Sequence, residues 1–564
     1  MERKGTAEMV NNTRLSRRRF IKQGMISATA AGVILAGCGG ENEGESTPRA
    51  TGGTEGEPKR GGQRERGTPG GFNIDPRLNY VAGPIVGSQC YSYLWTVRTD
   101  TDEIIPVCAT DIEQVDDLTY VFKINQNMQF HDTPEIRAKY PTLAGRHITA
   151  ADLKYSIETF RDTTAAVLRE YHLNEMDHVE VVDDYTLRLV NKRPYSWTLG
   201  PNSISGIVQG AIVAREVIEK EGDLRNTCVG SGPFIMDRFS QTEGIRVVRN
   251  PNYFVSDEPF LDSQRWRIIN DSETAEAAFR SRQIDTWAPP NALAFQSIKG
   301  ESGIASNKLL ASYEMQIGVK PEAAPWTDHR VLQALHYAID RDALILTLEG
   351  GRSGEESSDY GLWTGCVPSE MQAYDLSQDE LRELMPFKPE ESRSLLSAAG
   401  YDTVDVRVAH VNIGKTPLLA EAMASQLRAG GFNLILEPSE IARFAVSLIS
   451  GDFQMMAVQG LGESSPEQAL GQYVQPGASG AWGGWDMKDP EIKAAFEEMN
   501  RTFDAGERQE MAKKMTRLVL AKLPYLIRLY SPYDYQVRYD YVKGLNPERG
   551  GLAEAFNYRT WLDR

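Results

Sequence analysis

The chain has 564 residues, of which 41% are hydrophobic and 9% aromatic, and it carries a formal net charge of −17 at pH 7. This apolar content is sufficient for a large core divided among two or three domains. Nucleic acid is excluded as an expected partner, because proteins bind it through basic surfaces, and the acidity is typical of a soluble protein.

The N-terminus has the organisation of an export signal. Arg17 and Arg18 begin a basic run that leads into a weakly apolar stretch. This stretch is too short for a membrane span, which needs roughly 20 apolar residues. The paired arginines resemble a twin-arginine signal, and Leu35-Ala36-Gly37-Cys38 resembles a lipobox. We therefore expect residues 1–37 to be removed and Cys38 to carry a lipid anchor on the outer face of the membrane.

The segment that follows has the composition of a linker. Residues 38–68 contain few apolar side chains and are dense in Gly, Glu, Arg and Pro. Such a composition cannot bury a core, so we predict a flexible tether between the lipid and the folded body.

Strand and helix patterns alternate in the next part of the chain. Tyr120-Val-Phe-Lys-Ile124 has residues typical of a strand, and Thr149-Ala-Ala-Asp152 offers a capping box for a helix. The segments 179–182 and 185–190 flank Asp183-Asp184, which predicts a hairpin.

A second region predicts parallel strands. Asp328 is placed to begin a helix that we expect to continue to residue 349. Further on, an alternating strand pattern at 404–408 is followed by a helix from Pro417 and a second strand pattern at 432–436. Strand, helix and strand at this spacing indicate a βαβ unit.

Four cysteines remain after the lipobox: Cys90, Cys108, Cys228 and Cys366. There is no CxxC pair, so a clustered metal site is not indicated. Export makes disulfides chemically possible, but the spacings permit three connectivities. A free thiol in the core is an equal alternative for Cys108, which stands between Val107 and Ala109.

Two motifs suggest chemistry, and each also has an ordinary structural interpretation. Gly414-Lys415-Thr416 resembles the end of a phosphate-binding loop, but Ala409 replaces the required first glycine and Pro417 removes a backbone donor. His172, Glu175 and His178 have helical spacing that could hold a metal, although an exposed polar helix face explains them as well. No hydrolase motif is present.

Six further motifs follow one another along the chain: Ile74-Asp75-Pro76, Phe130-His131-Asp132, Val229-Gly230-Ser231-Gly232-Pro233-Phe234, Arg249-Asn250-Pro251-Asn252-Tyr253-Phe254, Pro325-Trp326-Thr327-Asp328 and Ala334-Leu335-His336-Tyr337-Ala338-Ile339-Asp340-Arg341. In this order they resemble the family 5 extracellular solute-binding proteins of ABC importers. Each motif is weak alone, but their order over most of the chain is specific.

The resemblance implies an α/β, two-lobed periplasmic-binding-protein-like fold (type II, cluster C) with an extra inserted domain. The expected divisions are lobe I at 69–90, 225–313 and 525–564, the inserted domain at 91–224, and lobe II at 314–524. The lobes are expected to close on a solute about a hinge, and an ABC permease is expected to bind the closed form. The resemblance implies a monomer with no catalytic residue, no metal site and no cofactor.

The family also implies which loops face the ligand. Carried over by position, the expected ligand-binding residues are Gln459, Gly460, Leu461, Glu463, Trp482, Trp485, Arg352 and Trp363. Core packing is the alternative for Trp482 and Trp485, and a surface ion pair is the alternative for Arg352.

The sequence departs from the family at three places. The loop at 459–463 lacks the Trp and the Asp that commonly meet a peptide amine, the turn after Phe130-His131-Asp132 has Thr133 in place of Gly, and the polar Gln63-Arg64-Glu65-Arg66 stands where an apolar strand is expected. A peptide or similar small solute is therefore the first expectation for the ligand. An exported metal-dependent enzyme centred on His172, and a sensor without a transport role, are the alternatives.

Overall fold

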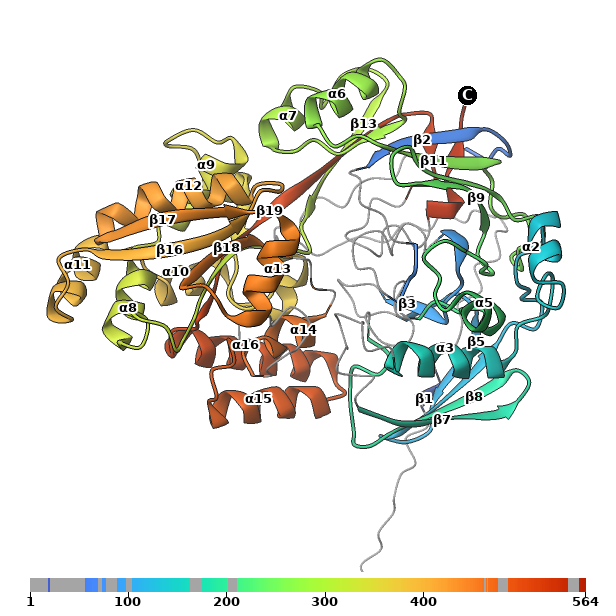
Figure 1. Ribbon diagram of the computed structural model, residues 1–564, viewed down its shortest axis with the longest axis horizontal. Helices are drawn as coiled ribbons and strands as arrows, with labels where there is room; N and C mark the ends of the chain where they lie inside the picture. Colours follow the sequence, from blue (N-terminus) through green and yellow to red (C-terminus); the bar gives the residue numbers. More distant parts are fainter. Residues whose placement is uncertain are drawn as a thin grey trace, which may run out of the picture.

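Two α/β lobes lie side by side and share one long strand, β19 (Figure 1). The computed structural model describes residues 19–20, 56–68, 74–77, 89–97, 104–162, 175–200, 210–460, 463, 465–474, 485–545 and 557–564. Arg17, Arg18 and Cys38 lie outside these residues. Within them, no helix combines the length and the apolar character needed to cross a membrane.

A twelve-stranded sheet runs through both lobes. Its main path has the order β17-β16-β18-β14-β19-β12-β2-β11-β10-β9, and β13 and β15 also pair with β19. Its strands are β2 (Gln63–Thr68), β9 (Phe234–Ser240), β10 (Gly244–Arg249), β11 (Ser263–Ile268), β12 (Thr286–Trp287), β13 (Ile304–Leu310), β14 (Met315–Val319), β15 (Gly361–Trp363), β16 (Val404–Val411), β17 (Phe432–Ser439), β18 (Met455–Gln459) and β19 (Leu526–Tyr539).

Lobe II carries most of the helices. They are α8 (His329–Tyr337), α9 (Arg341–Glu349), α10 (Gln378–Leu384), α11 (Pro389–Ala398), α12 (Thr416–Leu427), α13 (Ile441–Ser450), α14 (Pro466–Gly471), α15 (Pro490–Arg501) and α16 (Ala505–Ala521), with 3-10 turns at Ser357–Asp359, Ser369–Tyr374 and Arg428–Gly430. The helix predicted to run from Asp328 to residue 349 is in fact two helices. Asp328 accepts a hydrogen bond from the Arg330 N–H at 2.9 Å, and Asp340 caps α9 by accepting one from the Ala343 N–H at 3.0 Å.

The predicted βαβ unit is confirmed in lobe II. Strands β16 and β17 pair in parallel, from Val404 opposite Phe432 to Val411 opposite Ser439, and α12 connects them. The apolar face of α12 is buried in the same core as the inward side chains of both strands, which is the arrangement that the alternating pattern predicts.

The inserted unit is built on a separate five-stranded sheet of order β1-β5-β6-β8-β7. Its elements are β1 (Arg19–Phe20), β5 (Ala109–Gln114), β6 (Thr119–Ile124), β7 (Met176–Asp183), β8 (Thr186–Asn191), α2 (Pro134–Lys139), α3 (Ala150–Asp162) and α5 (Arg215–Glu221), with a small ribbon of β3 (Trp95–Val97) and β4 (Ile104–Pro106). The predicted hairpin is confirmed as β7 and β8. The predicted capping box is confirmed as well, since the Thr149 N–H donates to Asp152 at 2.9 Å.

Strand β2 corrects the predicted linker. Residues 63–68, assigned to a flexible tether, pair in parallel with β11 and lie inside the large sheet. The strand is stable despite its polar sequence because its side chains have partners in the fold. Arg66 stacks 5.8 Å from the ring of Trp266, and Glu65 pairs with Arg267 at 3.1 Å. The same lobe contains α6 (Ser272–Arg280), α7 (Ala292–Gln296), β20 (Val542–Lys543), a 3-10 turn at Asn557–Arg559 and β21 (Trp561–Leu562).

Strand β19 also corrects the predicted division between the lobes. Residues 525–564 were assigned to lobe I, yet the first part of β19 pairs with β14 and β15 of lobe II. The second part pairs with β12 and β13 of lobe I. The strand therefore belongs to both lobes, and Figure 1 shows it running diagonally from one to the other.

Candidate functional site in the interlobe region

The interlobe region is crossed by β19, and the partners of this strand change near Ser531. Tyr530 lies opposite Met315 and Trp363 in lobe II, whereas Tyr533 lies opposite Leu310 in lobe I. The side chains around this point belong to the segments that connect the lobes.

A buried charge cluster surrounds Arg528, the third residue of β19. Its guanidinium donates to Glu314, and also to Glu463 at 3.0 and 3.1 Å. The side chains of Arg528 and Glu314 are both 0% exposed. Burial raises the pKa of the Glu314 carboxyl well above its ordinary value.

A second cluster involves Tyr530 and Asp534, which lie further along the same strand. Glu349, at the end of α9, accepts hydrogen bonds from Lys415 at 2.5 Å and from the Tyr530 hydroxyl at 2.9 Å. Asp534 accepts a bond from the Tyr313 hydroxyl at 3.4 Å. Burial raises the pKa of Asp534 to about 6, although Lys415 opposes the shift. Lys415, which resembled a nucleotide-loop lysine in the sequence, is therefore occupied by a buried ion pair.

The loop after β18 is fixed directly to this crossing point. Gln459 is the last residue of β18 and lies opposite Met315. The Gly460 N–H donates to the Glu314 carbonyl at 2.7 Å, and the Glu463 N–H donates to the Ser312 carbonyl at 3.0 Å. Three predicted ligand residues, Gln459, Gly460 and Glu463, are thus brought together at the junction of the lobes. Leu461 lies outside the described residues.

The other described ligand predictions, Trp485, Trp363 and Arg352, have different surroundings. Trp485 is 2% exposed and packs against Gly318, where a Cβ atom would meet its ring at 2.3 Å. Trp363 is also buried in lobe II, and its Nε1 donates to Asp342 at 2.8 Å. Arg352 is exposed, and Trp482 lies outside the described residues.

A third feature joins the lobes away from β19, and we call it the interlobe contact. It consists of Tyr195, Ser196 and Trp197 from the inserted unit against α14, α15 and α16 of lobe II. Trp197 Nε1 donates to Asn500 Oδ1 at 3.0 Å, and the Ser196 N–H donates to the Asn500 carbonyl at 2.7 Å. The guanidinium of Arg508 lies 4.6 Å from the Trp197 ring.

The interlobe contact also buries an acid. The Tyr195 hydroxyl donates to Glu467 on α14. Burial raises the pKa of Glu467 to about 8, the hydrogen bond from Tyr195 opposes the shift, and the carboxylate of Glu175 adds to it. Glu467 is therefore largely protonated at neutral pH while the contact is intact.

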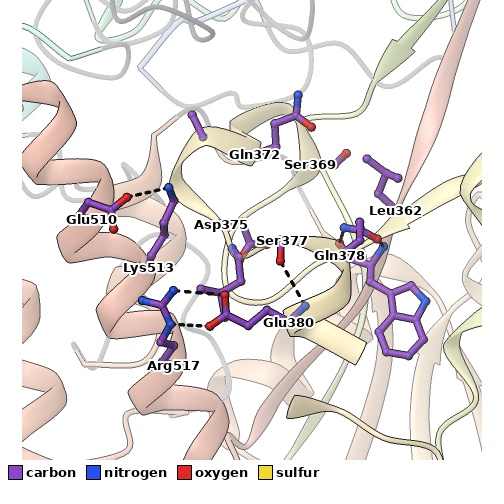
Figure 2. A pocket seen from close by; sticks show the side chains of 13 residues that line it. Leu362, Ser369, Gln372, Asp375, Ser377, Gln378, Glu380, Glu510, Lys513 and Arg517 are labelled. Carbon is purple, nitrogen blue, oxygen red and sulfur yellow. Dashed lines mark hydrogen bonds and ion pairs between the residues drawn. The ribbon is translucent and has the colours of Figure 1, made fainter. Parts of the chain in front are cut away.

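Lobe II contains a separate cavity of about 590 Å³ between β15, the turn at Ser369–Tyr374, α10 and α16. Figure 2 shows that both of its cations are paired with acids: Arg517 with Glu380 at 2.6 Å, and Lys513 with Glu510 at 2.9 Å. All of its lining residues come from lobe II. A solute bound there would not bridge the lobes, so this cavity is not the interlobe site.

The predicted metal alternative loses its helical geometry. Glu175 is followed directly by strand β7, on which His178 lies, and His172 is outside the described residues. Glu175 pairs with Arg193 at 2.5 Å, and His178 bonds to Asp177 at 2.7 Å. Among the described residues, no three His, Cys, Asp or Glu side chains are grouped to hold a metal ion.

Several residues of the site escaped the sequence analysis. The sequence around Arg528 does indicate a buried charge, because Arg528 is a single cation between Ile527 and Leu529 in an apolar strand. Glu314 stands just before an apolar strand and could have been noticed in the same way. Tyr195 and Glu467 carry no comparable signal, since each is unremarkable in its local sequence.

The two lobes, the shared strand and the interlobe contact define a two-lobed α/β binding protein. The profile described as "Bacterial extracellular solute-binding proteins, family 5 Middle" matches residues 103–481. The chain belongs to this family of extracellular solute-binding proteins, which confirms the predicted resemblance.

Comparisons with individual proteins agree. The chain is 26% identical over 291 residues to the glutathione-binding protein GsiB of Escherichia coli (strain K12), covering 51% of each. It thus spans about half the length of the curated relatives that it matches. The fold is similar to DppA of Helicobacter pylori in complex with peptide STSA, with a TM-score of 0.75, 19% identity and coverage of 90% of this chain and 99% of that one. It is also similar to the oligopeptide-binding protein AppA of Bacillus subtilis in complex with a nonapeptide, with a TM-score of 0.72, 17% identity and coverage of 90% and 100%.

Proposed function

We propose that this protein captures a peptide or similar small solute between its lobes and delivers it to an ABC permease. The observation that carries the proposal is the pair of connections between the lobes. Strand β19 joins them through the sheet, and the interlobe contact joins them away from this strand. Such an arrangement suits a protein that hinges on one side and closes on the other. The named ligands of GsiB, DppA and AppA favour a peptide as cargo.

Ligand capture is tested on residues 39–564, which omit β1 together with the predicted signal peptide but keep β2 of the large sheet. We expect denaturation to release a bound solute that mass spectrometry identifies as a peptide. Adding the identified peptide to the empty protein at about 100 times its Kd should stabilise the protein by about 2.7 kcal/mol in thermal unfolding. Trp482→Ala should weaken binding, whereas Phe387→Ala, which alters an aromatic side chain 42% exposed between α10 and α11, should not. No stabilisation by peptides, sugars or metal complexes would contradict solute capture.

We further propose that Cys38 carries the lipid that keeps this monomeric body near its permease, after export through the twin-arginine pathway. Burial of acyl chains in the membrane contributes about 0.8 kcal/mol per CH₂. Removing the chains should therefore release nearly all of the protein from the membrane. Cys38→Ser is expected to move the exported protein from the membrane fraction to the soluble fraction. Cys366→Ser, which alters a buried thiol of the body, should leave it membrane-bound. Equal release of both variants would contradict the anchor.

A further inference from the structure

The four cysteines of the folded body are all buried free thiols, and two of them lie together. Cys90 and Cys228 belong to the same apolar core, and the nearby thiol of Cys228 contributes to the raised pKa of Cys90. Cys108 is held through its backbone N–H to the Tyr93 carbonyl at 3.2 Å. Cys366 lies in a different core, beside Tyr473 and Thr516 of lobe II.

The backbones around the two paired cysteines are in direct contact. The Gly232 N–H donates to the Cys90 carbonyl at 3.0 Å. A Cβ atom at Gly230 would lie 2.0 Å from the Cys90 carbonyl oxygen, so only glycine permits this approach. His131 fixes the same segment, because its N–H donates to the Gly230 carbonyl at 2.7 Å. The two cysteines are therefore held near each other by the fold and not by a chance side-chain orientation.

The positions of Cys90 and Cys228 in the chain determine which segment a bond between them would enclose. Cys90 stands where the chain leaves lobe I for the inserted unit, and Cys228 stands where it returns. A covalent link here would close the whole inserted unit into one loop. Links that close long loops restrict the unfolded chain most, so this is the place where one bond would have a large effect.

We propose that Cys90 and Cys228 form a disulfide bond after export. The extracytoplasmic location of the family is chemically compatible with this, because structural disulfides persist outside the reducing cytoplasm. Of the three connectivities that the sequence permits, one contains this link, and it would also join Cys108 to Cys366. Cys108 and Cys366 lie in different cores, so they remain thiols.

The oxidant is another disulfide, either that of an extracytoplasmic thiol oxidoreductase or a low-molecular-weight disulfide. Cys228, which is 9% exposed where Cys90 is 0% exposed, reacts first. Its thiolate attacks the oxidant disulfide, forms a mixed disulfide and releases one thiolate of the oxidant. The Cys90 thiolate then attacks the Cys228 sulfur, and the second thiolate of the oxidant leaves. The two released thiolates take up the two protons, so the oxidant is reduced to two thiols.

Peptide mapping of the full chain tests the link directly. The protein is incubated with oxidised glutathione or with dithiothreitol, alkylated under denaturing conditions and digested without reduction. We expect the oxidised sample alone to contain a linked peptide pair carrying Cys90 and Cys228, and to melt at a higher temperature than the reduced sample. Cys108→Ser and Cys366→Ser should retain the link, whereas Cys90→Ser and Cys228→Ser should abolish it.

The peptide map of the wild-type protein tests the proposed disulfide even if one of the variants fails to fold. Alkylation of both Cys90 and Cys228 after oxidation would overturn the proposal. So would a link through Cys108 or Cys366, or glutathione left on Cys228 without closure to Cys90. None of these outcomes depends on solute binding, so they are distinct from a failure of the proposed transport function.

Discussion

Replacing Arg528 with Met is expected to lower the free energy of unfolding by about 3–5 kcal/mol. The guanidinium is the only cation bonded to Glu314 and Glu463 among the described ion pairs, and its side chain is 0% exposed. Without it, two carboxyl groups remain in the core, and each must either lose its charge or stay charged without a counter-ion. Urea unfolding at neutral pH, followed by circular dichroism, measures the loss.

Arg517→Met is the matched control for this experiment. Arg517 also pairs with a glutamate, Glu380 at 2.6 Å, but their side chains are 46% and 32% exposed. Exposed pairs contribute about 0–1 kcal/mol, so this variant should unfold almost as the wild type does. Adding Glu463→Gln to Arg528→Met should recover part of the stability, because it removes one unpaired charge. A loss below about 1 kcal/mol for Arg528→Met would show that the cluster does not stabilise the fold.

Stability is expected to fall as the pH rises from about 5 to about 8 through the titration of Glu467. Burial raises the pKa of this carboxyl to about 8 in the folded protein, from an ordinary value of 4.5. Between these values the unfolded chain loses the proton and the folded protein keeps it. The contribution is therefore complete below pH 4.5, declines by about 1.4 kcal/mol for each unit of pH, and is lost above the folded pKa.

Glu467→Gln isolates this contribution, because glutamine is neutral at every pH and still accepts a bond from Tyr195. The difference in unfolding free energy between the wild type and this variant should change with pH in the direction given above. Glu380→Gln is the control: the ion pair with Arg517 lowers the pKa of Glu380, so its titration falls at the acidic end. A wild-type minus Glu467→Gln difference that is constant from about pH 5 to about pH 8 would contradict a buried protonated Glu467.

Much of the fold could be predicted because local patterns and tertiary structure agree. The alternating residues of β16 and β17, the apolar face of α12 and the turn at Asp183-Asp184 all indicate what is observed. Strand β2 was missed for a physical reason. Its polar side chains give no strand pattern, and it is stabilised by partners such as Asp285 and Trp266, roughly 200 positions away in the sequence.

Only part of the candidate site could be predicted from the sequence, for a similar reason. The family resemblance located the loop at 459–463, and the structure places its described residues at the junction of the lobes. The family resemblance could not show that the carboxylate of Glu463 is bonded to Arg528, 65 positions away. Nor could it show that Glu314 accepts a bond from the same guanidinium across 214 positions. Whether Glu463 also meets a ligand remains a prediction. Tyr195 and Glu467 lie 272 positions apart and meet only through the arrangement of the lobes.

Strand β19 has a consequence for the order in which the protein can be assembled. It completes the sheet of both lobes, yet it comes from residues Leu526–Tyr539 of a 564-residue chain. During synthesis, neither lobe can acquire its full set of strand partners until β19 has left the ribosome. Folding of the two lobes therefore depends on the same late segment, and a chain truncated before β19 leaves both lobes unfinished.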